Sequence, residues 1–297
     1  DVDVDIISLD ANEKEIIESF TLEKMYLGRF PIMLKSDLCV LNKLSKEACF
    51  NMGECRNDQG GYFIIQGKEK AIISQEGFGN NMIYVRDSVS DTYSHSVEVR
   101  SVSEDSSKHI RTTAIYMVTS TPTLKKENMV VNIPNVKKPI PLFIVMRALG
   151  VISDKSIIEH CILDIDNEKF VELFTPSVYD AGTIFTQQAA LNYIKTFTKG
   201  RTIPHVYDIL MNYFLPHIGE LNFKSKAYYL GYMANELLKV YIKEEQPTDR
   251  DHFKFKRVEV PGVLIYQLFR EYYNLQQQDI FKTIDKEYYF HIGDYET

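Results

Sequence analysis

A short basic and aromatic stretch holds the residues of this chain most able to do chemistry. Residues 249–257 have the sequence DRDHFKFKR, in which Lys254, Lys256 and Arg257 cluster after an arginine flanked by two aspartates. Cations at this spacing can bind phosphate oxygens, while the aspartates orient Arg250 and the neighbouring backbone. Mutual pairing of the charges on an exposed surface explains the same composition, and the sequence leaves both interpretations open.

Three closely spaced carboxylates form a second candidate site. Asp164, Asp166 and Glu168 could hold Mg²⁺ or perform acid–base work, as in a metal-dependent nuclease. They follow a predicted helix in a polar stretch, so a solvated turn is the simpler interpretation. The sequence has no GxxxxGK[ST], GxGxxG, HExxH or GxSxG motif, and its seven histidines lack ligand spacing. We therefore predict no catalytic and no metal-binding residue in this chain.

Composition narrows the class of protein. The 297 residues include 34 Lys and Arg against 41 Asp and Glu, and this net charge of −7 argues against a small autonomous DNA-binding module. It does not exclude a local basic strip. Hydrophobic residues at 44% and charged residues at 25% are typical of a folded protein. The four cysteines have no CxxC spacing and are expected to be buried reduced thiols, and the absence of a long apolar run predicts an intracellular protein.

The first third of the chain is predicted to form strands. Residues 60–76 hold two apolar runs around a polar turn at Gly67, which indicates a β-hairpin that we expect to be covered on both faces. Pro31 interrupts an extended segment, which should lie at a sheet edge or bend. The alternating carboxylates Asp1, Asp3 and Asp5 fit an exposed strand end or frayed terminus better than a metal site. A small antiparallel sheet is expected from strand-like pieces at residues 82–86, 96–102 and 110–117.

Helices dominate the rest of the sequence. One is predicted to end at Gly150, and another to begin after an N-cap at Ser153, with Asp154 in its first turn. Apolar residues at helical spacing mark further helices, and each such stripe is expected to lie in the core. The predicted helices cover residues 142–149, 153–161, 186–197, 225–242 and 262–284. Strands followed by helices indicate the α+β class.

Four of these stretches resemble the second-largest subunit of multisubunit DNA-directed RNA polymerases of the eukaryotic and archaeal type. Residues 60–70 (GGYFIIQGKEK) with 74–76 (SQE) are similar to that subunit's GGYFIINGxEKxxxxQE signature. The other matches are residues 28–34 (GRFPIML), 139–150 (PIPLFIVMRALG) and 249–269, which begins DRDHF. The sequence departs from the pattern at Phe255 and Pro261. The resemblance spans nearly the whole chain.

The resemblance implies a two-domain α+β architecture. Residues 1–77 and 252–297 would form a discontinuous protrusion, with a mixed sheet and helices. Residues 78–251 would form an inserted lobe, with a small antiparallel sheet and helices. The two form one jaw of the DNA cleft in this family. The hairpin and the final helix should then pack together, while the middle segment forms its own core.

The family's reaction is template-directed nucleotidyl transfer, in which two Mg²⁺ ions stabilise the attacking and leaving oxygens. The resemblance implies that the catalytic ligands lie outside this chain, so it should be inactive alone and hold no cofactor, with Mg²⁺ present in the assembled polymerase. Its partners would be the largest subunit and other subunits, DNA, the RNA–DNA hybrid and initiation factors, with no membrane. The predicted nucleic-acid-binding residues are Arg250, Lys254, Lys256 and Arg257, followed by Lys68 and Lys70. An exposed hairpin tip is the alternative for the last two.

Two alternatives remain at this point. The chain could be a stand-alone, polymerase-derived interaction protein without a role in the cleft, or the independent nuclease described above. It begins at Asp1 rather than Met, and we expect it to be a piece of a longer protein. Departures within the motifs suggest a divergent lineage, such as a large DNA virus. The expected location is the nucleus for a cellular protein, and a virion or cytoplasmic factory for a viral one.

Overall fold

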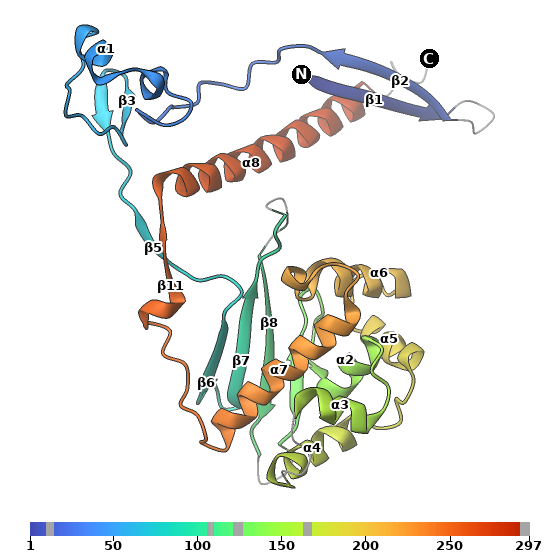
Figure 1. The fold of residues 1–297 in the computed structure, drawn as a ribbon. Helices are drawn as coiled ribbons and strands as arrows, with labels where there is room; N and C mark the ends of the chain where they lie inside the picture. The colour runs from blue at the N-terminus through green and yellow to red at the C-terminus, as the bar shows by residue number, and fades with distance from the viewer. Residues whose placement is uncertain (10–14, 106–107, 109, 121–126, 163–167, 292–297) are drawn as a thin grey trace. The chain divides into compact units, whose positions relative to one another are not determined.

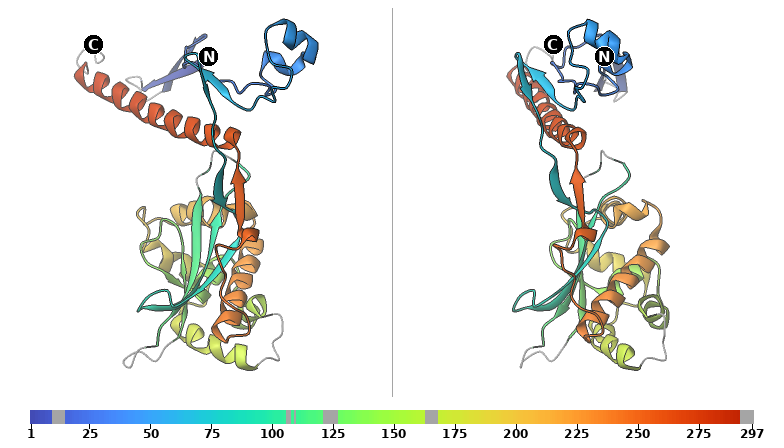
Figure 2. Two further views of the ribbon diagram at one scale, coloured as in Figure 1. Left: turned by 90° about the vertical axis from the view of Figure 1, so that its left-hand side faces the viewer. Right: turned by 60° about the vertical axis from the view of Figure 1, so that its left-hand side comes forward.

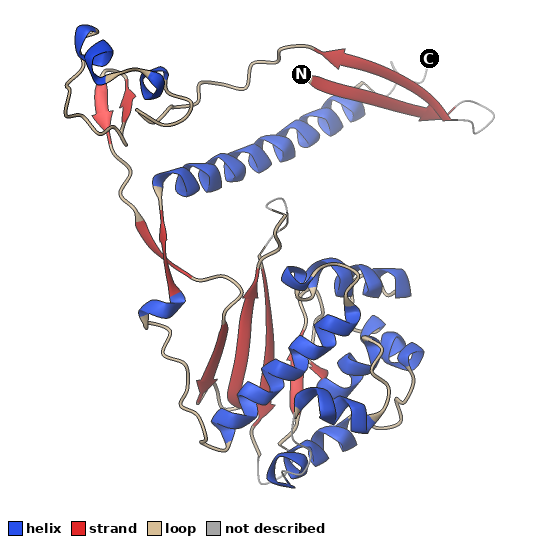
Figure 3. Ribbon diagram, viewed as in Figure 1, coloured by secondary structure: helices blue, strands red, loops and turns tan. Residues whose placement is uncertain are grey.

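The computed structural model describes residues 1–9, 15–105, 108, 110–120, 127–162 and 168–291. Helices accompany small antiparallel sheets, so the predicted α+β class is confirmed (Figures 1 and 3). The chain divides into two compact units. Unit 1 comprises Asp1–Gln75 with Glu259–Thr297, and unit 2 comprises Glu76–Val258. Residues 76–77 and 252–258, which we expected in the discontinuous domain, lie in unit 2. The assignment of the units as protrusion and lobe stays a prediction.

Unit 2 is built on a five-stranded sheet with the order β10-β9-β8-β7-β6. Every neighbouring pair is antiparallel, as predicted. The strands are β6 (Ile83–Asp87), β7 (Tyr93–Ser101), β8 (Arg111–Val118), β9 (Met129–Asn132) and β10 (Ile140–Pro141). Alternate residues such as Val97 and Val99 are fully buried, because successive side chains of a strand point to opposite faces. Sequence analysis found β6, β7 and β8 and missed β9 and β10.

The helices of unit 2 pack around this sheet. Helix α7 lies along strands β6 to β8 and also contacts α3 (Figure 2). At that contact Gly231 comes so close to α3 that a Cβ would lie 2.2 Å from the carbonyl oxygen of His160. The helices are α2 (Leu142–Ala148), α3 (Asp154–Cys161), α4 (Glu168–Asp180), α5 (Gln187–Lys195), α6 (Ile203–Asp208) and α7 (Phe223–Tyr241). Shorter turns are η2, a π-helix (Ile209–Tyr213), η3 (Pro216–Ile218) and η4 (Phe253–Phe255).

Helix starts and stops follow the sequence signals closely. Gly150 has a φ of +102°, which confirms the predicted glycine stop after α2. The Thr186 hydroxyl accepts a hydrogen bond from the Ala189 backbone N–H at 3.2 Å and so caps α5. Ser153 is the N-cap of α3, but its side chain makes no capping hydrogen bond. Asp154 in the same turn instead binds Arg147.

Among the described residues of unit 2, Arg147 is the largest fully buried side chain. Its guanidinium donates hydrogen bonds to the carbonyl oxygens of Ile152 and Ile184 and forms an ion pair with Asp154. All seven residues of α2 are buried, so this arginine enters the core as part of an otherwise apolar helix. Its partners offset the desolvation of the charge, which ties α2 to the start of α3.

Unit 1 contains two hairpins and a long helix. Strands β1 (Val2–Leu9) and β2 (Glu15–Leu22) pair antiparallel, and so do β3 (Phe63–Ile65) and β4 (Lys68–Lys70). These pairs differ from the mixed sheet expected for the protrusion. The remaining elements are η1 (Val40–Lys43), α1 (Lys46–Asn51) and α8 (Pro261–Phe290). The alternating carboxylates lie along an exposed strand, as the simpler interpretation held, and Asp3 accepts a hydrogen bond from Thr21 at 2.8 Å.

Two burial predictions for unit 1 are wrong. Helix α8 has no buried residue, although we expected its apolar stripe to lie in the core. The β3–β4 hairpin was expected to be covered on both faces, but Ile64 and Ile65 are exposed while Phe63 is buried. Apolar spacing shows that a surface is suited to burial, and it cannot show whether another described element covers that surface.

The segment around Pro31 forms no strand. It is hydrogen-bonded to the start of the hairpin, since the Leu34 N–H donates to the Tyr62 carbonyl at 2.8 Å and the Gly61 N–H donates to the Leu34 carbonyl at 3.0 Å. Next to it, the Phe30 and Phe269 rings meet edge to face with centroids 5.6 Å apart.

All four cysteines are free, but only Cys49 and Cys161 are buried, so the expectation of buried thiols holds for two of them. Among the described residues, no helix is both long enough and apolar enough to cross a membrane.

Candidate nucleic-acid interface

The segment that carries most of the predicted cations runs along the edge of the unit 2 sheet. Thr248 pairs with β6 through two hydrogen bonds: its N–H donates to the Val85 carbonyl at 2.8 Å, and its hydroxyl accepts from the Val85 N–H at 3.1 Å. Because β6 is an edge strand, these contacts satisfy backbone groups that would otherwise stay unpaired. The chain then passes through η4 into β11 (Lys256–Glu259), which pairs with β5 (Gln75–Phe78).

Phe255 anchors this segment. The side chain is buried, and its ring lies 5.2 Å from that of Tyr84. The Phe255 carbonyl accepts a hydrogen bond from the Gly79 N–H at 2.6 Å, and the Tyr84 hydroxyl donates to the Gly79 carbonyl at 3.2 Å. One of the two positions where the sequence departs from the polymerase pattern is therefore an apolar anchor, which fixes the backbone of the basic residues on either side of it.

Arg250 is held by aromatic rings and by a carboxylate distant in the sequence. Its guanidinium carbon lies 4.8 Å from the Phe78 ring centroid and 5.3 Å from that of Tyr84, and Nη1 lies 3.8 Å from Glu98 Oε1. Glu98 also forms an ion pair with Arg86. Asp249, which we expected to orient Arg250, forms no ion pair with it among the described residues. The expected backbone role of Asp249 is confirmed, because its Oδ1 accepts the Asp251 N–H at 2.9 Å.

Lys256 is also compensated within the protein. Its Nζ lies 3.0 Å from Glu76 Oε1, 3.5 Å from Asp251 Oδ1 and 4.1 Å from the Phe78 ring centroid. The hydrogen bond to Glu76 raises the pKa of this lysine. With only 14% of its side chain exposed, Lys256 links β11 to β5 and offers little of its charge to a ligand.

Lys254 and Arg257 are the exposed cations of the segment. The Arg257 guanidinium donates to the carbonyl oxygens of Lys254 at 3.0 Å and Lys256 at 2.7 Å, so it stays close to its own backbone. Lys254 Nζ lies 4.7 Å from the Phe255 ring centroid. Neither residue forms an ion pair with any described residue. The structure therefore brings the four predicted cations together but divides them into two compensated and two uncompensated residues.

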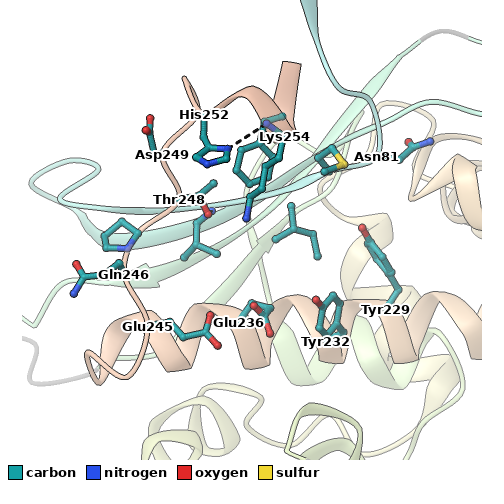
Figure 4. Close-up of a pocket in the computed structure, with 15 residues that line it drawn as sticks. Asn81, Tyr229, Tyr232, Glu236, Glu245, Gln246, Thr248, Asp249, His252 and Lys254 are labelled. Atoms are coloured by element: carbon teal, nitrogen blue, oxygen red, sulfur yellow. Dashed lines mark hydrogen bonds between the residues drawn. The ribbon is translucent and has the colours of Figure 1, made fainter. Parts of the chain in front are cut away.

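Lys254 points into a cavity of about 540 Å³ between the edge segment and α7 (Figure 4). Sequence analysis did not foresee this cavity, because its walls come from residues far apart in the chain. Helix α7 contributes Tyr229, Tyr232 and Glu236. Burial raises the pKa of Tyr229 to about 12, so its hydroxyl stays protonated and can donate a hydrogen bond at neutral pH.

The remaining candidates lie elsewhere. Lys68 and Lys70 are exposed on β4 in unit 1, where Lys70 faces Phe63 and Lys68 faces Ile65 across the hairpin. Asp164 and Asp166 lie outside the described residues, as does the side chain of Glu168 at the start of α4. Among the described residues, no group of three His, Cys, Asp or Glu side chains is placed to hold a metal ion.

Comparison with known proteins decides the family. Residues 2–290 match the family described as RNA polymerase beta subunit. The chain belongs to this family. It is 36% identical over 276 residues to DNA-directed RNA polymerase II subunit RPB2 of Encephalitozoon cuniculi, which covers 90% of this chain and 24% of that protein.

Relatives from two other lineages agree. The same subunit of Schizosaccharomyces pombe is 34% identical over 272 residues, covering 89% of this chain and 22% of that protein. DNA-directed RNA polymerase subunit Rpo2 of Saccharolobus solfataricus is 32% identical over 274 residues, covering 89% of this chain and 23% of that protein. The resemblance to the second-largest subunit of eukaryotic and archaeal polymerases is confirmed. This beta-subunit chain spans about a quarter of the length of these relatives.

Proposed function

We propose that this beta-subunit chain forms one jaw of the DNA cleft in a multisubunit DNA-directed RNA polymerase. In this proposal unit 1 is the discontinuous protrusion and unit 2 is the inserted lobe. The match of residues 2–290 to the family carries the proposal. The division of the chain supports it, because unit 1 is assembled from the two ends of the sequence around an intervening unit with its own core.

The work of this section is mechanical and electrostatic. Nucleotidyl transfer takes place elsewhere in the assembled enzyme, on Mg²⁺ ions held by other parts of the polymerase. In this proposal the chain alone has no activity, and it contributes by holding nucleic acid while other residues perform the chemistry.

Lys254 and Arg257 make the phosphate contacts, and Arg250 and Lys256 position them. The first two are exposed and uncompensated, whereas the second two are tied to Glu98, Glu76 and the aromatic rings. Lys68 and Lys70 form a weaker, separate contact from unit 1. Contacts to phosphate carry no base information, which suits an enzyme that must transcribe any sequence.

The acidic remainder of the surface serves partners. A net charge of −7 limits nonspecific adhesion to nucleic acid away from the basic residues and suits basic segments of other proteins. The partners are the largest subunit, other polymerase subunits, the DNA, the RNA–DNA hybrid and initiation factors. The eukaryotic relatives favour the nucleus as the location, and a viral protein would act in a virion or cytoplasmic factory.

The test is the salt dependence of complexes formed by the assembled polymerase. Replacing Lys254 and Arg257 with Gln removes two phosphate contacts, so the slope of log K against log[salt] should fall in magnitude by about 1 to 2. The control replaces Lys155 and Lys224, which are exposed on α3 and α7, and should leave the slope unchanged. An equal slope for both variants would show that the edge segment does not face nucleic acid.

A further inference from the structure

A second group of cations lies on unit 2, partly on the connection between β9 and β10, and β10 is the edge strand opposite β6. Two chain segments carry it, and an antiparallel bridge between Val136 and Thr198 joins them. The Lys137 N–H donates to the Phe197 carbonyl at 3.0 Å, which holds the segments side by side. We call this group the bridge cluster, and its members are Lys137, Lys138, Lys195, Lys199 and Arg201.

The charge of the bridge cluster is uncompensated. Residues 128–153 and 181–207 contain no aspartate or glutamate. Among the described residues, none of the five cations forms an ion pair. All except the half-buried Lys195 are exposed. Five neighbouring cations without a counterion repel one another, and in a chain with a net charge of −7 they create a local positive field.

The backbone beneath the cluster is well anchored. Val136 and Thr198 at the bridge are buried, and the Thr198 hydroxyl donates to the Lys195 carbonyl at 2.9 Å. Arg201 has a φ of +46°, a left-handed conformation that costs a non-glycine residue about 1 to 2 kcal/mol. The chain therefore places a cation where glycine would be favoured.

The surroundings of the cluster indicate the class of its ligand. Residues 128–151 and 186–206 contain no exposed large hydrophobic side chain. Protein–protein interfaces are centred on buried aromatic or aliphatic anchors, whereas nucleic-acid interfaces are more polar and much more positive. The nearby Tyr193 and Phe197 rings pack against each other and against the core, so they offer no platform for unpaired bases. These features favour the phosphate backbone of a duplex.

We propose that the bridge cluster is a second nucleic-acid contact of this chain, which binds the phosphate backbone of double-stranded nucleic acid without reading its sequence. The inference rests on the proposed function for the presence of a duplex. It goes beyond that function by adding a surface whose five cations all lie outside the polymerase-like motifs, with Lys137 and Lys138 immediately before the motif at residues 139–150.

The test measures binding of the 297-residue chain to a fluorescent 20-base-pair duplex by anisotropy, between 50 and 200 mM salt. The variant K137Q/K138Q/K199Q/R201Q removes four exposed cations, so the salt slope should fall in magnitude by about 2 to 4. The control variant K155Q/K169Q/K224Q/K243Q removes four other exposed lysines of unit 2 and should change the slope by less than 1. The single variant Arg201→Gly removes one charge and also relieves the strain of the left-handed backbone. The salt slope should fall in magnitude by about 1, and loss of folding cannot explain that fall.

Each outcome bears on a different claim. Equal slopes for the cluster and control variants would overturn the inference. The proposed function would survive that result if K254Q/R257Q lowered the slope in the same assay, and it would fall if the chain bound the duplex without any salt dependence. Poly-glutamate, compared with unlabelled duplex at equal charge, should displace the fluorescent duplex less strongly. Equally strong displacement would overturn the duplex assignment in favour of an acidic protein segment. Stronger binding of a single strand than of the duplex would also contradict it.

Discussion

Lys226 makes the stability of unit 2 depend on pH in a direction that can be calculated. The side chain is fully buried on α7, and its Nζ lies 2.7 Å from the Leu210 carbonyl oxygen and 2.8 Å from that of Met211. Both acceptors belong to the π-helix η2. Burial, followed by the charge of Lys108, lowers the pKa of Lys226 from 10.5 to about 8. A neutral amine still has two N–H groups, so deprotonation retains both hydrogen bonds.

The sign follows from proton binding by the two states. Between pH 8 and 10.5 the unfolded chain keeps the Lys226 proton while the folded chain has lost it, so stability rises with pH across this window. Below pH 8 both states are protonated and the full penalty for the buried charge applies. The shift of the pKa corresponds to an upper bound of about 3 kcal/mol, and screening by nearby solvent should reduce it to about 1 to 2 kcal/mol.

The assay is urea unfolding of the 297-residue chain, followed by far-UV circular dichroism at pH 7.5 and pH 10. Other groups titrate in this range, so the quantity of interest is the stability of the wild type relative to Lys226→Met. Raising the pH from 7.5 to 10 should increase the free energy of unfolding of the wild type by about 1 to 2 kcal/mol relative to that of Lys226→Met. Lys224→Met, at an exposed position on the same helix, should show no such shift. A difference for Lys226→Met that does not change with pH, or that changes in the opposite sense, would refute the reasoning.

Two further substitutions test the packing that positions the interface. Gly231→Ala should destabilise unit 2 by about 3 kcal/mol, because its Cβ would overlap the His160 carbonyl oxygen, whereas Gly262→Ala has open space and should be neutral or slightly stabilising. Arg147→Met should cost about 3 kcal/mol, since it leaves the Ile184 carbonyl and Asp154 without their partner, and Arg100→Met at an exposed position should cost less than 0.5 kcal/mol. Urea midpoints measure both pairs, and a Gly231→Ala protein as stable as Gly262→Ala would show that α3 and α7 do not approach so closely.

Local signals in the sequence predicted helices α2, α3, α5 and α7 of unit 2, but they missed α4 and α6. A glycine at position 150, N-cap residues at 153 and 186, and apolar residues at helical spacing each act within a few residues, so they can be recognised without the fold. The same logic failed for α8. Its stripe has the pattern of a core helix, but burial depends on a covering element, and no described residue of α8 is buried.

The interface could be predicted only in part, because its energetics depend on residues distant in the sequence. The cations of residues 249–257 were evident, but Glu98 beside Arg250 and Glu76 beside Lys256 reach their positions only through the sheet and the β5–β11 pair. These two carboxylates decide which cations remain available to a ligand. The bridge cluster was missed for the same reason, since its two segments are about 60 residues apart and each carries only two or three cations.

Purification of the protein from its source through a tag on this subunit tests the central claim most directly. The account predicts that the tagged chain isolates together with a largest polymerase subunit, and that the complex synthesises RNA on a DNA template only when Mg²⁺ is present. Isolation of the chain as a lone polypeptide, in a preparation without template-directed RNA synthesis, would contradict the account and favour a stand-alone interaction protein.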